Sequence, residues 1–426
     1  MSPRMPNSLI SSGKPATVRR RRVESLEIVR AICALTVFSN HLYSKIPGVP
    51  QYTVLNMVTN FATEAVIGFF VLSGLVISYQ QYDTIQNYIV ARVVRIIPIY
   101  YIALVITIGA MLICSESVHL NQVLGNALFL QTLNGDIVNP LPYNLPLWSL
   151  SYEVFNYLMF ITVLTFPRLF SPLFLISIIS GIMTYFFTFP EGIVSWFVHI
   201  FSFLSYWMIG VIVIKCFERG KIASLETGIY SFMVGVCISR TPLSYDYFDF
   251  IRLLGFAIGT GLLCSALLGN GPEVAKVYGA RLSVSRLNAY WRIGIATCAV
   301  AMLWELSPSL RLTKVTLTIG VLIVTIVPSW LLKCGGIALL PLRVTLIYMG
   351  GLSYALYVIH YPIICLFNGL HLKISPILEV IMVVALSTFI AHVLDYRLQH
   401  FIRVLLYRIR GMGMPILNAR APGPEI

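Results

Sequence analysis

The chain has 426 residues, of which 58% are hydrophobic and 11% are charged, and its formal net charge is +13. A soluble protein of this length needs far more charge on its surface, so the composition favours a polytopic membrane protein. The basic residues fall in short clusters between apolar stretches, which argues against nucleic-acid binding and is typical of positively charged cytoplasmic loops.

Apolar windows near the length of a spanning helix, roughly 20 residues, predict an all-α, polytopic transmembrane helix bundle of about 10–12 spans. The seventh window is short, and if it only enters the membrane, the count falls by one and the later topology inverts. The windows lie at 28–44, 57–79, 96–114, 147–166, 172–188, 193–217, 226–240, 250–269, 290–307, 315–332, 344–368 and 376–395.

Charge predicts the orientation of these spans. With the run "VRRRR" (18–22) in the cytoplasm, 24 of the 30 Lys and Arg residues fall inside under a twelve-span topology, and both termini are cytoplasmic. The loop 115–146 has no Lys or Arg and is expected outside. We therefore expect basic cytoplasmic segments at 1–25 and 406–426 around a membrane domain at 26–405, whose first span is retained rather than cleaved.

The first span, "RAICALTVFSNHLY" (30–43), carries two polar side chains that a bilayer disfavours. Arg30 and His41 are eleven residues apart, which places them on one helix face to within about 20° and roughly 16 Å apart along the axis. A structural interpretation is a snorkelling anchor and a hydrogen-bonded interface residue. Polar residues inside membranes are nevertheless candidates for function.

A second pair follows the second span directly. Arg92 and Arg95 in "ARVVRIIPIYY" (91–101) are three residues apart, on one helical face at the expected cytoplasmic surface. Two guanidinium groups there suit the binding of phosphate, although anchoring of the span explains them as well.

Several further polar residues fall in the expected outer half of the membrane. They also allow a structural interpretation as an aromatic belt, a helix cap and interhelical hydrogen bonds. They are Glu64 in the second span, Trp148, Ser149 and Glu153 in "WSLSYE" (148–153), and His360 in "LSYALYVIHYP" (352–362), where it shares a stripe with Ser353 and Tyr357.

In this order, R-x10-H, "FFVLSG" (69–74), R-x-x-R, "WSLSYE" and "LSYALYVIHYP" resemble the acyltransferase-3 family of integral-membrane acyltransferases. The resemblance covers residues 25 to about 405. It implies transfer of an acyl group, usually acetyl from acetyl-CoA, to a hydroxyl of a glycan or similar acceptor. It also implies that His41 is the catalytic histidine, that Arg30 is its motif partner, and that Arg92 and Arg95 bind the phosphates of acyl-CoA.

The chain departs from the family pattern at two places. Many members have a carboxylate just before the "FF" of the second span, where this chain has Ile67, with Glu64 one turn earlier. The closing E-x-P pattern of the family appears here as Gln399-His400-Phe401.

The chemistry is consistent with this assignment. A histidine can take the proton of a hydroxyl that attacks the thioester, and Glu153 or Glu64 is expected to orient the imidazole. Trp148, Ser149 and His360 are assigned to the acceptor substrate. Direct transfer and an acyl-histidine intermediate both remain open.

The expected partners follow from the resemblance. They are acyl-CoA as co-substrate, a glycan acceptor (exopolysaccharide, lipopolysaccharide or lipo-oligosaccharide) and the bilayer, expected to be that of the bacterial inner membrane, with no nucleic acid. The cysteines lie singly without C-x-x-C spacing, so we expect no metal, and no permanently bound cofactor. Two alternatives stay open, a transporter or flippase of a lipid-linked saccharide and a non-catalytic membrane subunit.

Overall fold

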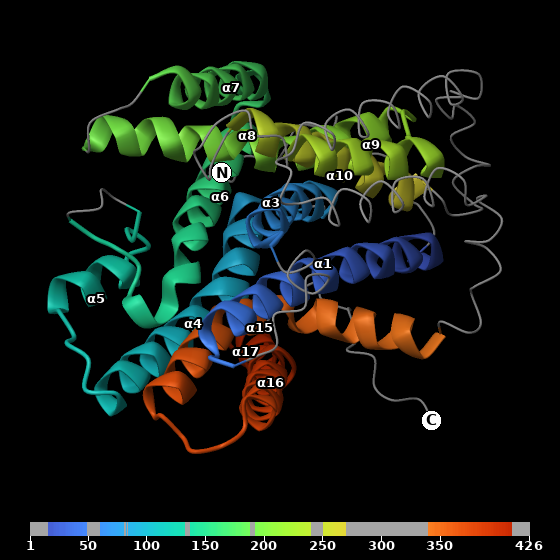
Figure 1. Ribbon diagram of the computed structural model, residues 1–426. Coiled ribbons are helices and arrows are strands. Elements are labelled where there is room, and N and C mark those ends of the chain that lie inside the picture. Colours follow the sequence, from blue (N-terminus) through green and yellow to red (C-terminus); the bar gives the residue numbers. More distant parts are fainter. Residues whose placement is uncertain are drawn as a thin grey trace, which may run out of the picture.

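The computed structural model describes residues 16–48, 60–80, 82, 84–132, 137–187, 192–239, 250–269 and 340–410. All the helices and turns of this part of the chain pack into one helical bundle (Figure 1), in which α1 and α15 lie side by side near the middle. The all-α helix bundle that the sequence predicts is confirmed.

Eight of the described helices are long and apolar enough to cross a membrane. Ten of the predicted spans correspond to described helices. The helix α9 is short, as its window suggested. The predicted spans at 290–307 and 315–332 lie outside the described residues. The elements are α1 (Ala16–Lys45), α3 (Ala62–Tyr79), α4 (Ile85–Ile113), α5 (Leu120–Ala127), η2 (Pro142–Leu147), α6 (Trp148–Thr165), η3 (Pro167–Leu169), α7 (Phe170–Phe186), α8 (Ile193–Glu218), α9 (Leu225–Ser239), α10 (Phe250–Gly269), α15 (Leu340–Gly369), α16 (Pro376–His392), η5 (Val393–Leu398) and α17 (Gln399–Arg410).

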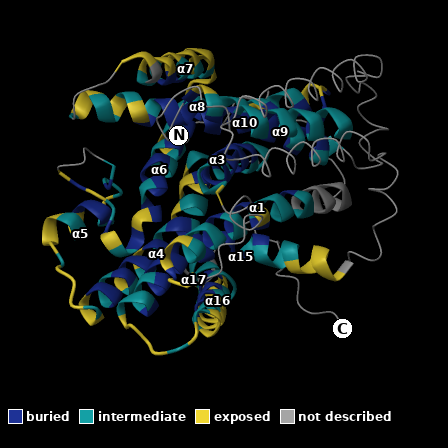
Figure 2. Cartoon of the chain, in the orientation of Figure 1, coloured by how far each residue is buried: buried dark blue, intermediate teal, exposed yellow. Residues whose placement is uncertain are grey.

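Burial separates the inner helices from the outer ones (Figure 2). Large apolar side chains are exposed on α7, such as Ile176 and Phe186, and on α16, such as Ile381 and Phe389. On a soluble protein such faces would be unfavourable, whereas in a bilayer they contact lipid. The middle helices, in contrast, bury most of their side chains against one another.

Small residues let α3 and α8 approach closely. A Cβ atom on Gly74 would collide with the carbonyl oxygen of Trp207, and one on Gly210 would collide with that of Val71. Close backbone approach at glycine is a common way for membrane helices to gain packing contacts. Here it also brings the Trp207 indole within 3.2 Å of the Ser73 hydroxyl, next to Gly74 in the chain.

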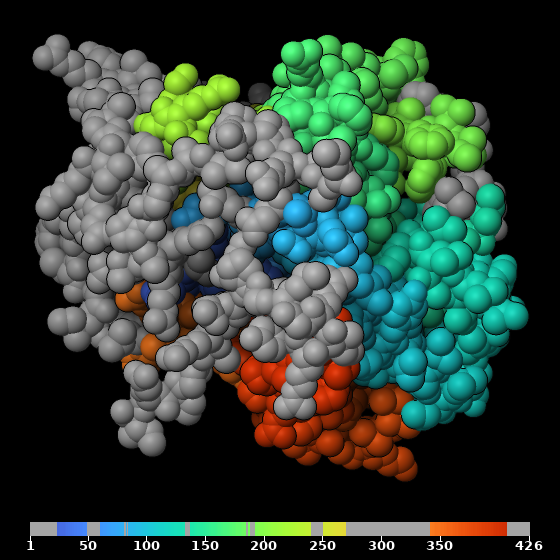
Figure 3. All heavy atoms as spheres, turned by 180° about the vertical axis from the view of Figure 1, so that it is seen from behind, coloured from blue at the N-terminus to red at the C-terminus, as the bar shows by residue number. Residues whose placement is uncertain are grey.

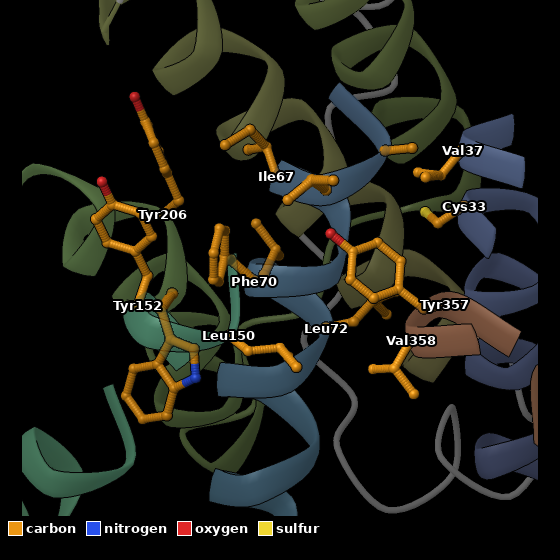
Figure 4. Packing of buried hydrophobic residues seen from close by; sticks show 14 of the residues in the cluster. Cys33, Val37, Ile67, Phe70, Leu72, Leu150, Tyr152, Tyr206, Tyr357 and Val358 are labelled. Atoms are coloured by element: carbon orange, nitrogen blue, oxygen red, sulfur yellow. The ribbon is translucent and has the colours of Figure 1, made fainter. Parts of the chain in front are cut away.

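Close backbone packing at a glycine also joins α1 to α15, because Gly350 lies directly against the backbone of Glu27. From there the two helices continue side by side into the core. Figure 4 shows Tyr357 of α15 reaching towards α3, with Val37 and Cys33 of α1 nearby. This packing places the histidines of α1 and α15 in one region.

Two prolines inside spanning helices free backbone carbonyls, because proline has no N–H to donate to the residue four positions earlier. Pro98 of α4 frees the carbonyl of Val94, which accepts a hydrogen bond of 2.9 Å from the side-chain amide of Gln399. In Figure 3 the red C-terminal segment adjoins the blue and cyan segment that includes α4.

Pro362 of α15 frees the carbonyl of Val358 in the same way, and the side-chain amide of Asn144 donates to it at 2.9 Å. The same amide also donates to the Thr107 hydroxyl at 2.9 Å. In lipid such a carbonyl needs an internal partner. The turn η2 therefore holds α15 and α4 together, close to Tyr357 of α15.

Candidate functional site

The two histidines of the sequence motifs contact each other. Nδ1 of His41, on α1, lies 2.8 Å from Nε2 of His360, on α15, although the residues are 319 positions apart. The other ring nitrogen of His360, Nδ1, lies 2.9 Å from the carbonyl oxygen of Leu356, one turn earlier. His360 is 1% exposed, whereas His41 is half-buried. The pair therefore has a buried inner member and an accessible outer one.

Aromatic rings hold this pair in place. Phe38 packs edge-on to His360 at 5.3 Å between ring centres, and Tyr361 packs edge-on to His41 at 4.9 Å. Because these neighbours come from both α1 and α15, each imidazole is restrained by its own helix and by the facing one. Such restraint favours a fixed ring geometry, which acid–base chemistry requires.

One turn before His360, Tyr357 joins α15 to the start of α6. Its hydroxyl donates to the carbonyl oxygen of Pro146 at 2.9 Å and lies 2.8 Å from the Ser149 hydroxyl. Ser149 itself lies 3.2 Å from the same carbonyl. Ser149, which the sequence motifs assign to substrate binding, thus already has two protein partners. Its assignment to the acceptor stays a prediction.

Glu153 lies one turn further along α6. Its carboxylate accepts a hydrogen bond from the Ser73 hydroxyl of α3, which in turn accepts one from the Trp207 indole at 3.2 Å. Glu153 therefore connects α6 with α3 and α8. The sequence motifs single out Glu153 as a functional residue, but they do not identify Ser73 and Trp207 as its partners.

The expectation that Glu153 or Glu64 orients His41 is matched by no direct contact among the described residues. His360 forms the hydrogen bond to Nδ1 of His41, and neither glutamate hydrogen-bonds this ring in the described part of the chain. Glu153 accepts instead from Ser73 of α3, and Glu64 is buried in the first turn of α3. The orienting role of either glutamate stays a prediction.

Polar contacts continue along α6 at intervals of four residues. Ser149 contacts Tyr357, Glu153 contacts Ser73, and Tyr157 lies next to Arg92 at the other end, with 6.0 Å between the guanidinium and the ring centre. Eight residues of helix cover about 12 Å. We call this line of side chains the polar seam: Arg92, Tyr157, Glu153, Ser149, Tyr357, His360 and His41.

Asn156 lies beside the polar seam. It is seven residues beyond Ser149, which places it on the same face of α6 to within about 20°. Its side chain is 0% exposed, and neither its Nδ2 nor its Oδ1 atom has a hydrogen-bond partner among the described residues. Burying both a donor and an acceptor unpaired is costly, so this amide is a position where a ligand group would gain two hydrogen bonds.

Arg92 marks the far end of the seam. Its Nη2 donates to the side-chain oxygen of Gln80 at 2.8 Å and to the Tyr82 hydroxyl at 3.0 Å. Burial raises the pKa of Tyr82, with the charge of Arg92 opposing the shift, so that the hydroxyl stays neutral. No carboxylate of the described residues forms an ion pair with Arg92. Its positive charge is therefore available to an anion.

Arg95 has a different environment. Its Nη1 lies 2.5 Å from Oδ1 of Asp395, whose side chain is 2% exposed, and Oδ2 of Asp395 accepts from the backbone N–H of Ala355 at 3.2 Å. Asp395 lies in the π-helical turn η5, a local widening that is common near functional sites. Arg95 thus joins α4 to η5 and α15, and its charge is already compensated.

Comparison with known families agrees with these motifs. The sequence model described as an acyltransferase domain, that of the acyltransferase-3 family, matches residues 23–396. The chain belongs to the acyltransferase-3 family. It matches no curated protein and no solved structure at a significant level.

The family membership, together with the eight apolar helices, makes the chain a membrane acyltransferase of this general kind. The family motifs map onto the polar seam at both ends, with His41 at one and Arg92 at the other. Arg30, the arginine of the R-x10-H motif, is not hydrogen-bonded to His41 and donates to both carboxylate oxygens of Glu27, at 3.0 and 3.1 Å. The i,i+3 spacing of Glu27 and Arg30 was a sequence signal for this pair.

Other motif residues of this acyltransferase-3 chain have packing roles. Trp148 lies edge-on to Tyr152 and to Phe203, both at 5.7 Å between ring centres. Gln399, at the family's closing pattern, donates to the carbonyl of Val94 and so has a structural role on α4 in this chain. Among the described residues, no group of three His, Cys, Asp or Glu side chains is placed to hold a metal ion.

Proposed function

We propose that the protein transfers an acyl group, acetyl in the simplest case, from cytoplasmic acyl-CoA to a hydroxyl group of a glycan. The observation that carries this proposal is the polar seam, which runs between helices from the uncompensated charge of Arg92 to the hydrogen-bonded pair His41–His360. Polar residues are expensive inside a membrane bundle and line pathways of substrates where they occur in series. The glycan acceptor rests on the resemblance of the motifs to the acyltransferase-3 family.

The donor suits the arginine end of the seam. Acyl-CoA carries phosphates at one end and two amide groups in its pantetheine arm, before the thioester. Arg92 offers a charge without an ion-pair partner in the described chain, and Asn156 offers an unpaired amide between Arg92 and the histidines. A guanidinium suits phosphate, and an amide side chain suits another amide. Arg95, on the same helix face, is proposed to support this end of the site through its ion pair with Asp395.

The histidine end suits the reaction. In our proposal His41 takes the proton of the acceptor hydroxyl while its oxygen attacks the thioester carbonyl, and the thiolate of CoA leaves. Direct transfer and an intermediate acylated on the histidine both use this residue. The cell compartment we propose is the bacterial inner membrane, with both termini in the cytoplasm. The protein itself would need no bound cofactor.

The function is tested by mass spectrometry of surface glycans from cells with and without the protein. We expect the glycans of producing cells to carry the mass of one added acyl group, which also identifies the group and the acceptor. Equal masses together with altered amounts of surface glycan would contradict the proposal and favour transport of a lipid-linked saccharide.

Orientation provides a separate prediction, because acyl-CoA is found in the cytoplasm. Gln86, at the start of α4, and Ser117, just beyond its end, are both exposed. With each changed to cysteine in a chain without other cysteines, we expect a membrane-impermeant maleimide to label Ser117→Cys in intact cells. Gln86→Cys should react only after the membrane is opened. The reverse labelling would place Arg92 outside and overturn the proposed donor path.

A further inference from the structure

Hydrogen bonding between the two histidines bears on which atom reacts. A carbonyl oxygen only accepts, so the contact of His360 Nδ1 with the carbonyl of Leu356, at 2.9 Å, requires the proton of this imidazole to be on Nδ1. Nε2 of neutral His360 then has a lone pair and no proton. A second proton would put a charge on a side chain that is 1% exposed, at high cost.

The same rule applies to the next bond. Nε2 of His360 must accept, so the proton in its 2.8 Å contact with His41 is supplied by Nδ1 of His41. Neutral His41 has only one ring proton, and its Nε2 is therefore left with a lone pair. No described residue hydrogen-bonds this Nε2, and His41 is half-buried rather than enclosed.

Ring geometry supports a well-formed bond. The two imidazole planes are inclined by 11°, and their centres are 5.1 Å apart. This separation exceeds the N···N distance by about two ring radii, each about 1.1 Å for a five-membered ring with bonds near 1.35 Å. Both nitrogens thus lie near the line between the ring centres, so the N–H points along the lone pair of the other ring.

We infer that His360 is a positioning residue, which, with the carbonyl of Leu356, holds His41 in the tautomer whose Nε2 is the reactive atom. This inference rests on the proposed function and specifies how its central residue works. His360 takes the place that a carboxylate occupies in a catalytic triad, where the partner fixes both the tautomer and the orientation of the imidazole.

The proton then follows a closed path. Nε2 of His41 takes the hydroxyl proton as the acceptor oxygen bonds to the thioester carbon. When the C–S bond breaks, the leaving thiolate takes that proton back from Nε2. The products are the ester and free CoA thiol, and both histidines return to their starting tautomers. If His41 carries the acyl group, the same Nε2 forms the bond to carbon.

Three replacements of His360 separate positioning from simple structure. Leucine removes the acceptor, glutamine places an amide oxygen near the position of Nε2, and asparagine reaches only as far as Nδ1. Initial rates per mole of protein would be measured in membrane vesicles that contain the native glycans, supplied with acetyl-CoA labelled in the acetyl group. We expect His360→Leu and His360→Asn to lower kcat about 10²–10³-fold with the KM for acetyl-CoA within about threefold, because the wrong tautomer leaves binding intact.

Rescue and non-additivity are the readouts that a structural role would not produce. We expect His360→Gln to recover at least about tenfold over His360→Asn, and the double variant His41→Ala/His360→Leu to be no slower than His41→Ala alone, as for residues that act as a unit. His392→Leu is the matched control. His392 has a comparable bond of 2.9 Å to the Tyr348 hydroxyl, away from the seam.

The outcomes distinguish the inference from the proposed function. Near-normal activity of His360→Leu, or equal activity of the glutamine and asparagine variants, would overturn the positioning role while leaving His41 as the catalytic residue. Activity retained in His41→Ala would overturn the proposed function itself. Should His360→Leu fail to fold, the comparison of glutamine with asparagine still decides, because both are polar and similar in size.

Discussion

Replacing His41 by alanine is expected to reduce acyl transfer about 10³-fold. The physical reason is that the remaining imidazole, His360, is 1% exposed, and its Nε2 ends 2.8 Å short of the His41 ring, so it does not reach the position of the His41 Nε2. General-base catalysis contributes typically 10²–10⁴-fold, and loss of a nucleophile costs at least as much. The measurement is transfer of labelled acetyl from acetyl-CoA to glycan in membrane vesicles.

Folding of the variant must be shown independently. His41 is half-buried, so its truncation leaves no large enclosed cavity, and we expect normal membrane insertion and a thermal unfolding midpoint in detergent within a few degrees of the wild type. His392→Ala serves as the matched control, because it too removes a hydrogen-bonded imidazole, here from α16. Transfer at the wild-type rate in His41→Ala would remove this residue from the reaction.

The helices were predictable because their signal is local. The length and apolarity of a segment decide whether it can cross the membrane, and neither depends on neighbouring helices. For this reason ten of the predicted windows correspond to described helices. The site was predictable only in part. The motifs predicted that His41 and His360 both lie in the outer half, but not that the two rings touch, because this depends on how α1 packs against α15 at Gly350.

The sequence shows which backbone carbonyls lack a helical donor, but it does not show which side chains donate to them instead. Pro98 and Pro362 each imply a carbonyl without its helical donor, which the sequence alone shows. The donors, Gln399 and Asn144, are 305 and 214 positions away from the carbonyls they satisfy. No local pattern contains such a pairing. The same is true of Ser73 as the partner of Glu153.

Replacing Arg95 by alanine is expected to destabilise the protein, with loss of activity as a consequence. The change leaves Asp395, 2% exposed, with a buried charge and, within the described part of the chain, only the N–H of Ala355 as a partner. Removal of one member of a buried ion pair costs about 3 kcal/mol or more. We expect the thermal unfolding midpoint in detergent to fall by roughly 5 °C or more. The double variant Arg95→Ala/Asp395→Ala should regain part of this loss, since it removes the uncompensated charge.

Arg92→Ala is the matched comparison, because it removes the same side chain one turn earlier on α4. Arg92 has only the neutral partners Gln80 and Tyr82 in the described chain, so its loss orphans no carboxylate and should leave the unfolding midpoint nearly unchanged. If its charge receives the phosphates of acyl-CoA, the KM for acetyl-CoA should instead rise about tenfold or more, since a charge-assisted bond to phosphate contributes about 1.5–3 kcal/mol. Equal changes of stability and KM in both variants would show that the two arginines act together, and an unchanged KM in Arg92→Ala would exclude it from donor binding.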